Sequence, residues 1–144
     1  MAKLTIEKRK NTANLNAAEI ELDELRDYDI LGQGCFSDCA TLRSIEIPKN
    51  VYEIEANAFS TCSQLTSITF ESGSKLSALG ALAFYGCQSL TSISLPTSLS
   101  NIDPYAFYYT GMRNVTGLNK TISALFPTEY TQITSIIIPA NAVI

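Results

Sequence analysis

Four cysteines are the residues of this chain that are best suited to chemistry, and the chain has no histidine at all. A thiolate can serve as a nucleophile or as a zinc ligand, but a catalytic cysteine or serine normally depends on a neighbouring histidine. No two cysteines have the Cys-x-x-Cys spacing of common zinc sites either. We therefore expect no catalytic residue, no metal site and no cofactor, and we expect the protein not to be an enzyme.

The spacing of the cysteines instead predicts a structural role. Cys39, Cys62 and Cys87 follow one another at intervals of 23 and 25 residues, and Cys35 stands where later segments carry alanine. We expect reduced thiols that are buried as small hydrophobic side chains. Neighbouring coils of a stacked repeat lie only about 5 Å apart, so a disulfide between Cys39 and Cys62 is a geometrically possible alternative.

The acidic residues near the start of the chain could in principle hold a hard cation such as calcium. Their spacing does not match that of a calcium-binding loop, so we interpret them as a solvated, charged edge of the structure. The segment Gly32–Gly34 is likewise too short for a phosphate-binding loop and is predicted to form a turn. The acidic residues concerned are Glu19, Glu21, Asp23, Glu24, Asp27 and Asp29.

Size and charge narrow the possible functions further. The 144 residues suffice for one domain, and 46% of them are hydrophobic, which is ample for a core. The net charge of −4 argues against a nucleic-acid partner, because such binders carry basic stripes. No apolar run approaches the roughly 18 residues of a membrane span, and the start of the chain lacks the apolar core of a signal peptide. We therefore expect no nucleic acid and no membrane insertion.

An internal repeat dominates the rest of the sequence. Four phenylalanines recur at steps of 23 or 25 residues, and leucines and isoleucines keep the same step. A fixed period of roughly 20–29 residues with such anchors is typical of a leucine-rich repeat solenoid. The recurring residues are Phe36, Phe59, Phe84 and Phe107, then Leu42, Leu65 and Leu90, and finally Ile45, Ile68 and Ile93.

One repeat is expected to form one coil of an α/β-type repeat solenoid. In Ser44–Ile47 the side chains alternate, so that the two isoleucines point inward and the polar residues outward. Pro48 ends this strand because it has no N–H to donate. The chain then returns through a short helical, irregular or extended segment that carries Ala58 and Phe59. Stacked coils would form a parallel β-sheet on one face and share one continuous core.

The repeat weakens towards both ends. Residues 17–144 are predicted to form a solenoid of about four to five repeats, and residues 1–16 lie outside the pattern as an N-terminal cap or a docking arm. Residues 2–7 alternate and could form a strand. Ala17, Ile20 and Leu22 copy the strand pattern of the later repeats. Residues 71–75 include two extra positions and are predicted to form a surface loop.

The central repeats share the run Cys-x-x-Leu-x-Ser-Ile, which is followed later by an Ala-Phe pair. The run extends from Cys39 to Phe59, from Cys62 to Phe84 and from Cys87 to Phe107. In these motifs the chain resembles the BspA-like (Treponema pallidum-type) leucine-rich repeats. The resemblance implies an extended solenoid of bacterial or protist surface proteins that bind host proteins or other cells, and so a location at the cell surface or outside the cell. No catalytic residue belongs to the family motif.

Function then depends on the exposed residues. Outward strand positions of successive repeats should form columns on the sheet face, which solenoids use for binding; a merely soluble face is the alternative. Three tyrosines beside Phe107 are favoured contact residues, unless they simply cover the flank. The candidates are Glu46, Thr69, Ser94, Thr116 and Ile137 in one column, Ser44, Ser67, Ser92, Asn114 and Ser135 in its neighbour, and Tyr105, Tyr108 and Tyr109 on the flank.

We therefore predict a non-enzymatic protein-interaction or adhesion module with an unknown protein partner. The alternative is a structural or attachment subunit of a larger assembly, such as a virus or phage particle, which the missing signal peptide favours. Self-association through the C-terminal edge is a further hypothesis. There Ile133, Ile136 and Ile138 occupy core positions of a strand, and Ile137 adds an apolar side chain on the outward face.

Overall fold

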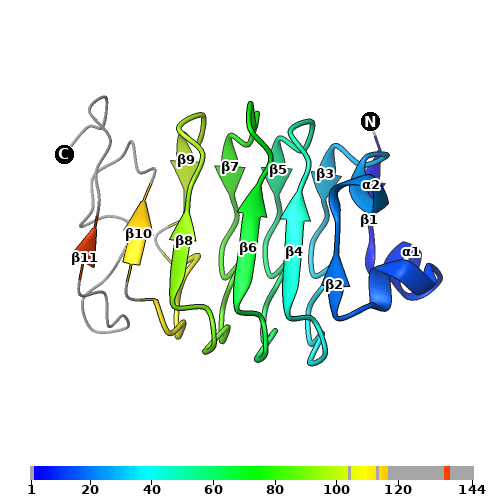
Figure 1. Cartoon of the computed structure of the whole chain (residues 1–144), viewed down its shortest axis with the longest axis horizontal. Helices are drawn as coiled ribbons and strands as arrows, with labels where there is room; N and C mark the ends of the chain where they lie inside the picture. The colour runs from blue at the N-terminus through cyan, green and yellow to red at the C-terminus, as the bar shows by residue number, and fades with distance from the viewer. Residues whose placement is uncertain (1, 104, 113, 117–134, 137–144) are drawn as a thin grey trace.

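The computed structural model describes residues 2–103, 105–112, 114–116 and 135–136. These residues form a solenoid of stacked coils, whose strands lie side by side from β1 and β2 near the N-terminus to β10 and β11 at the other end (Figure 1). The strands of neighbouring coils are parallel. The predicted α/β-type repeat solenoid is thereby confirmed.

The longer strands lie on one side of the coils, which we call the strand face. They form two three-stranded parallel sheets, in the orders β2-β4-β6 and β11-β10-β8. Ser44 lies opposite Ser67 and Ile45 opposite Ile68, so the repeats stack in the register that their spacing predicts. The strands are β2 (Glu19–Ile20), β4 (Ser44–Ile47), β6 (Ser67–Phe70), β8 (Ser92–Ser94), β10 (Asn114–Thr116) and β11 (Ser135–Ile136).

Within the described residues, the return segments hold a second set of strands, each two residues long. These strands form one continuous five-stranded parallel sheet in the order β1-β3-β5-β7-β9. In the central coils the return segment thus begins extended, and the Ala-Phe pair follows in a turn. The extended part satisfies its backbone N–H groups through hydrogen bonds to the neighbouring coil. The strands are β1 (Lys3–Leu4), β3 (Ile30–Leu31), β5 (Glu53–Ile54), β7 (Ala78–Leu79) and β9 (Asn101–Ile102).

The four recurring phenylalanines form a stack through the middle of the molecule. Their side chains are 0–1% exposed. Consecutive rings have centroids 5.2–5.3 Å apart and lie within 3–6° of parallel. The N–H groups of Phe36, Phe59 and Phe84 also donate to the alanine carbonyl of the next coil, as from Phe59 to Ala83 at 2.7 Å. The spacing of the rings is therefore fixed by the backbone as well as by packing.

Each core phenylalanine is held in a turn whose flanking residues have left-handed backbone conformations. Two positions before it stand Gly34, Asn57 and Leu82, and two positions after it stand Asp38, Thr61, Gly86 and Tyr109. Their φ angles lie between 57° and 73°. Glycine and asparagine adopt this conformation readily, whereas leucine, threonine and tyrosine do so at a cost.

The cysteines are free thiols. Cys35, Cys62 and Cys87 are fully buried. The Cys62 thiol donates to the Phe36 carbonyl and the Cys87 thiol to the Phe59 carbonyl, each at 3.0 Å, so these thiols also link neighbouring coils. Cys39 departs from the prediction, because it is only half-buried: it belongs to the first of these coils, and no equivalent coil covers it on the N-terminal side.

The N-terminal residues pack against the first coil. β1 pairs with β3, and Leu4 and Leu15 are buried. The strand that alternation predicted for residues 2–7 is only two residues long. Thr5 ends it by accepting a hydrogen bond from the Lys8 N–H, which caps the helix α1 (Ile6–Lys10). A 3-10 helix follows at Ala13–Asn16.

Arg9 of α1 closes the N-terminal end of the phenylalanine stack. Its residue is 8% exposed, and its guanidinium carbon lies 6.0 Å from the centroid of the Phe36 ring. Its Nε donates to the Cys35 carbonyl at 2.5 Å, and its Nη1 donates to Asn16. In later coils the equivalent alanine carbonyl accepts from the phenylalanine N–H of the preceding coil. Arg9 therefore supplies both a ring cover and a donor where no preceding coil exists.

The first coil follows the predicted pattern only in part. Ile20 pairs with Ile45 and is buried, as its position predicts. Ala17 and Leu22 are half-buried rather than core residues. The chain turns into the short helix α2 (Leu22–Leu25) here, and Leu25 of this helix and Leu15 of the N-terminal segment belong to the buried core.

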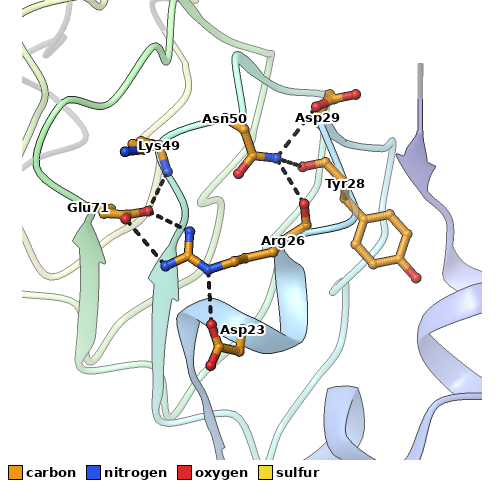
Figure 2. Close-up of polar contacts among 7 residues, drawn as sticks. All are labelled: Asp23, Arg26, Tyr28, Asp29, Lys49, Asn50 and Glu71. Atoms are coloured by element: carbon orange, nitrogen blue, oxygen red, sulfur yellow. Dashed lines mark hydrogen bonds and ion pairs between the residues drawn. The ribbon is translucent and has the colours of Figure 1, made fainter.

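A network of polar contacts joins this first coil to the predicted loop 71–75 (Figure 2). The Arg26 guanidinium donates to Asp23 in α2 at 2.9 Å and to Glu71 at 3.3 Å. Glu71 also accepts from the Lys49 N–H of the coil between them at 2.9 Å. The Asn50 amide donates to the Tyr28 carbonyl at 2.6 Å. Three successive coils are thus tied together at this edge of the strand face.

Candidate functional site

The predicted columns of polar residues run along the strand face. Glu46 lies opposite Thr69, and Ser94 lies opposite Thr116 of β10. In β4 the side chains alternate between half-buried and buried, and in β6 and β8 the serine and threonine side chains are exposed. The predicted assignment of inward and outward positions is therefore confirmed for β4, β6 and β8.

The strand face is interrupted between β6 and β8. These neighbouring strands belong to different sheets, although β7 and β9 of the same coils remain paired. A groove with a volume of about 510 Å³ lies at this interruption, and we call it the seam groove. It is lined by residues 66–70 of β6 and its approach, and by Ser92, Ile93 and Ser94 of β8.

Phe70 lies at one end of the seam groove, where it is half-buried. It occupies the inward position that Ile47 holds in the coil before, and Ile47 is fully buried. A second hollow of about 360 Å³ shares Phe70 and Ser94 with the groove and continues it towards residues 71–74. The groove thus combines exposed hydroxyl groups with an accessible aromatic edge.

Sequence reasoning missed this groove, although two signals for it were present. The two extra residues before Lys75 lengthen the path between β6 and β7, and Phe70 stands where the neighbouring repeats carry Ile47 and Leu95. Both features lie next to the interruption. Neither signal shows that β6 and β8 separate while β7 and β9 stay paired, because strand pairing depends on the tertiary structure.

The predicted tyrosines lie together on the flank of the solenoid, and Tyr85 of the preceding coil joins them. Tyr105 and Tyr109 are 48% and 50% exposed. The rings of Tyr108 and Tyr109 have centroids 4.4 Å apart, and Tyr85 lies 5.8 Å from both of them. Tyr105 meets Tyr108 edge to face at 5.7 Å. We call these four residues the tyrosine cluster; the sequence did not indicate Tyr85, which lies a full repeat away.

Two other predicted sites can be placed only in part. Ile137, Ile133 and Ile138 of the hypothetical self-association edge lie outside the residues that the structure describes. The acidic residues near the start are partly engaged in local contacts: Glu21 and Glu24 form the capping box of α2, and Asp23 pairs with Arg26. In the described part of the chain, no group of three or more cysteine, aspartate or glutamate residues could hold a metal ion.

The described helices are also all too short and too polar to cross a bilayer.

Comparison with known proteins gives a family and a fold. The family model described as BspA type leucine rich repeat region matches residues 29–144, in six copies. No curated protein matches the chain at a significant level.

Two solved structures share the fold. A leucine rich cell surface protein from Faecalibacterium prausnitzii has a TM-score of 0.65 and 23% identity, over 88% of this chain and 37% of that protein. The T. pallidum leucine rich repeat protein has a TM-score of 0.52 and 20% identity, over 84% of this chain and 73% of that protein. The chain thus spans little more than a third of the length of the Faecalibacterium protein.

Proposed function

Because the chain belongs to the BspA-type leucine-rich repeat family, we propose that it is a non-enzymatic module that binds another protein. Repeats of this kind build extended surfaces from stacked coils, and such surfaces commonly serve recognition. The described residues offer no histidine-dependent dyad and no metal cluster that would suggest chemistry instead.

The seam groove is the feature of the structure that supports a binding site on the strand face. It lies on the strand face, and the predicted contact residues Thr69 and Ser94 line its two sides. Its hydroxyl groups can donate and accept hydrogen bonds, and the half-buried Phe70 offers an apolar contact. An anchoring side chain that fills such a pocket and excludes water contributes most of the affinity in protein interfaces. A protein partner that inserts one apolar side chain beside Phe70 fits this arrangement.

Adhesion at the cell surface is the biological setting that we propose for this binding. The similar Faecalibacterium protein is described as a leucine rich cell surface protein, and we extend that location to the present chain. The acidic net charge of −4 suits a protein partner better than a nucleic acid.

Peptide selection tests the proposed binding surface. A phage-displayed library of random linear peptides is panned on the immobilised protein, and the selected peptides are titrated against three variants. Thr69→Arg and Ser94→Arg place a long charged side chain at the groove and should weaken binding by roughly ten-fold or more. Ser44→Arg adds the same charge to the same face outside the groove and should leave binding unchanged.

Thr69→Arg and Ser94→Arg should keep their stability within about 0.5 kcal/mol, since exposed substitutions rarely cost more, and a melting curve checks that the half-buried position of Ser44 tolerates arginine. Selected peptides that bind all three variants as tightly as the wild type would place recognition elsewhere on the molecule.

A further inference from the structure

A hollow on the flank of the solenoid arises from the residues two positions after each core phenylalanine. Along the stack these residues are Asp38, Thr61, Gly86 and Tyr109, and we call them the left-handed column. Gly86 stands between Thr61 and Tyr109 in this column and adds no side chain to the wall of the hollow. The hollow has a volume of about 450 Å³ and is lined by Thr61, Ser63, Tyr85, Gly86, Gln88 and Tyr109.

Gly86 packs closely against the coil before it. Its φ is +73°, and a Cβ atom built on it would lie 3.3 Å from Cγ2 of Thr61. Asp38 shows what a side chain does at this position of the column, because its carboxylate accepts a hydrogen bond from the Thr61 hydroxyl of the next coil. A side chain at position 86 would crowd Thr61 and add bulk to the wall of the hollow that both residues line.

Two tyrosines of the tyrosine cluster form the aromatic wall of the hollow. Tyr85 and Tyr109 meet at an interplanar angle of 69°, and Tyr109 is 50% exposed. Tyr109 has a φ of 57°, a conformation that a bulky residue adopts only at a cost in free energy.

The remaining lining residues are polar and uncharged. Ser63 and Gln88 are exposed, and their side chains make no hydrogen bond to any residue within the described ranges. The serine hydroxyl and the glutamine amide each offer both donors and acceptors. The hollow therefore presents two tyrosine rings on one side and free hydrogen-bonding groups of both kinds on the other.

We propose that this hollow is a subsite for one ring of an uncharged carbohydrate. The C–H groups on the face of a sugar ring carry partial positive charge and are attracted to the negative face of a tyrosine ring. The hydroxyl groups at the edge of the sugar donate and accept, which matches Ser63 and Gln88. Because the lining carries no charge, an anionic sugar would lose its hydration without gaining a counter-charge.

A proline-rich peptide is the competing ligand class, since proline rings also stack on tyrosine. It fits less well for two reasons. Its backbone offers mainly acceptors, which would leave the acceptor oxygens of Ser63 and Gln88 unpaired. The hollow also spans only the short stretch of the column from Thr61 to Tyr109, which suits one ring better than an extended chain. The proposal concerns the flank and does not depend on protein binding at the strand face.

Saturation-transfer NMR of the whole chain with a panel of free sugars tests the proposal. The neutral probes are D-glucose, D-galactose, D-mannose, L-fucose and N-acetyl-D-glucosamine, and the comparison probes are N-acetylneuraminic acid and a proline-rich peptide. At least one neutral sugar should bind saturably with a Kd on the order of a millimolar, as expected for a ligand of this size. The anionic sugar and the peptide should bind more weakly.

Gly86→Asn is the decisive variant, because asparagine tolerates a positive φ while its side chain fills the hollow. It should weaken sugar binding by roughly ten-fold or more. Gln88→Ala should weaken binding too. Because Gln88 is exposed, this variant tests the hollow even if Gly86→Asn fails to fold. Tyr105→Ala removes an exposed tyrosine of the same cluster that does not line the hollow, and it should leave the Kd unchanged.

Binding of the peptide in place of every neutral sugar would overturn the carbohydrate assignment, and so would the absence of saturable binding by any neutral sugar. An unchanged affinity in both Gly86→Asn and Gln88→Ala would place the sugar elsewhere. Ser94→Arg at the seam groove should bind sugar normally, so the two proposals can fail separately.

Discussion

Two columns of residues run along the solenoid only two chain positions apart, one through the interior and one over the flank. The interior column is phenylalanine in all four described coils, with rings 5.2–5.3 Å apart. The left-handed column contains four different residue types, namely Asp38, Thr61, Gly86 and Tyr109. Both columns share one turn geometry, so the backbone alone does not explain the contrast.

The contrast reflects what each column contacts. An interior ring must fit between two identical neighbours, and any other side chain would leave a cavity or cause overlap. A residue of the left-handed column has solvent on one side, so its size and polarity can differ from coil to coil. Features that distinguish this chain from other solenoids are therefore to be sought in the second column and on the strand face.

The largest effect is expected from removing one ring of the interior column. Phe59→Ala should lower the free energy of unfolding by about 3–5 kcal/mol, because Phe59 is fully buried and stacked on both sides. Urea denaturation followed by circular dichroism measures the loss. Thr61→Asn, two positions along the chain, should change stability by less than about 1 kcal/mol. Equal losses at the two positions would show that the columns do not differ as described.

A smaller loss is expected at the N-terminal end of the interior column, where we propose that residues 1–16 act as a cap. Arg9→Ala should cost about 2 kcal/mol, since the buried Cys35 carbonyl loses its donor and Phe36 loses its cover. Lys10→Ala, exposed on the same helix, is the matched control and should cost less than about 0.5 kcal/mol. Denaturation curves that coincide for the two variants would indicate a loosely attached arm instead.

A gain in stability is expected where a turn residue is mismatched to its backbone. Leu82 has a φ of 57° at a position where Gly34 and Asn57 stand in other coils. Leu82→Asn should raise the free energy of unfolding by about 1 kcal/mol, because asparagine reaches the left-handed region at lower cost. Ala81→Asn, at the adjacent exposed position, should give no gain. A destabilised Leu82→Asn variant would mean that packing of the leucine outweighs the strain.

The smallest effect is a pH dependence at the edge of the strand face. The hydrogen bond from the Lys49 N–H lowers the pKa of Glu71 below its ordinary value of 4.5, with Arg26 acting in the same direction against partial burial. Since the folded-state pKa is depressed, the contribution of Glu71 is present above pH 4.5 and is lost as the pH falls through the folded value. Glu71→Gln should therefore destabilise the protein at neutral pH and flatten the decline in stability below pH 4.5.

Urea titrations of both proteins across the acidic range measure this difference. Parallel stability curves for the wild type and Glu71→Gln would show that the network in Figure 2 contributes no proton linkage.

The sequence by itself determined the coil and its core. The positions of Phe36, Phe59, Phe84 and Phe107, and of the isoleucines of β4, β6 and β8, followed from a period that each coil must share with its neighbours. Such a core is quasi-one-dimensional, so spacing along the chain translates directly into stacking in space. The prediction was weaker at the N-terminal end. Leu15 and Arg9 are buried there, but they belong to a segment without the repeat, so the period could not indicate their burial.

Only the tertiary structure decided which exposed groups meet. The contact of Tyr85 with Tyr109, the hollow that Gly86 and Tyr109 line, and the groove beside Phe70 all lie between coils. They depend on turn conformations and on which strands remain paired after an insertion, and a repeat period contains neither. Stacking constrains the residues inside a coil and leaves those on its surface free to differ. The repeat pattern therefore predicts the core residues but not the surface residues.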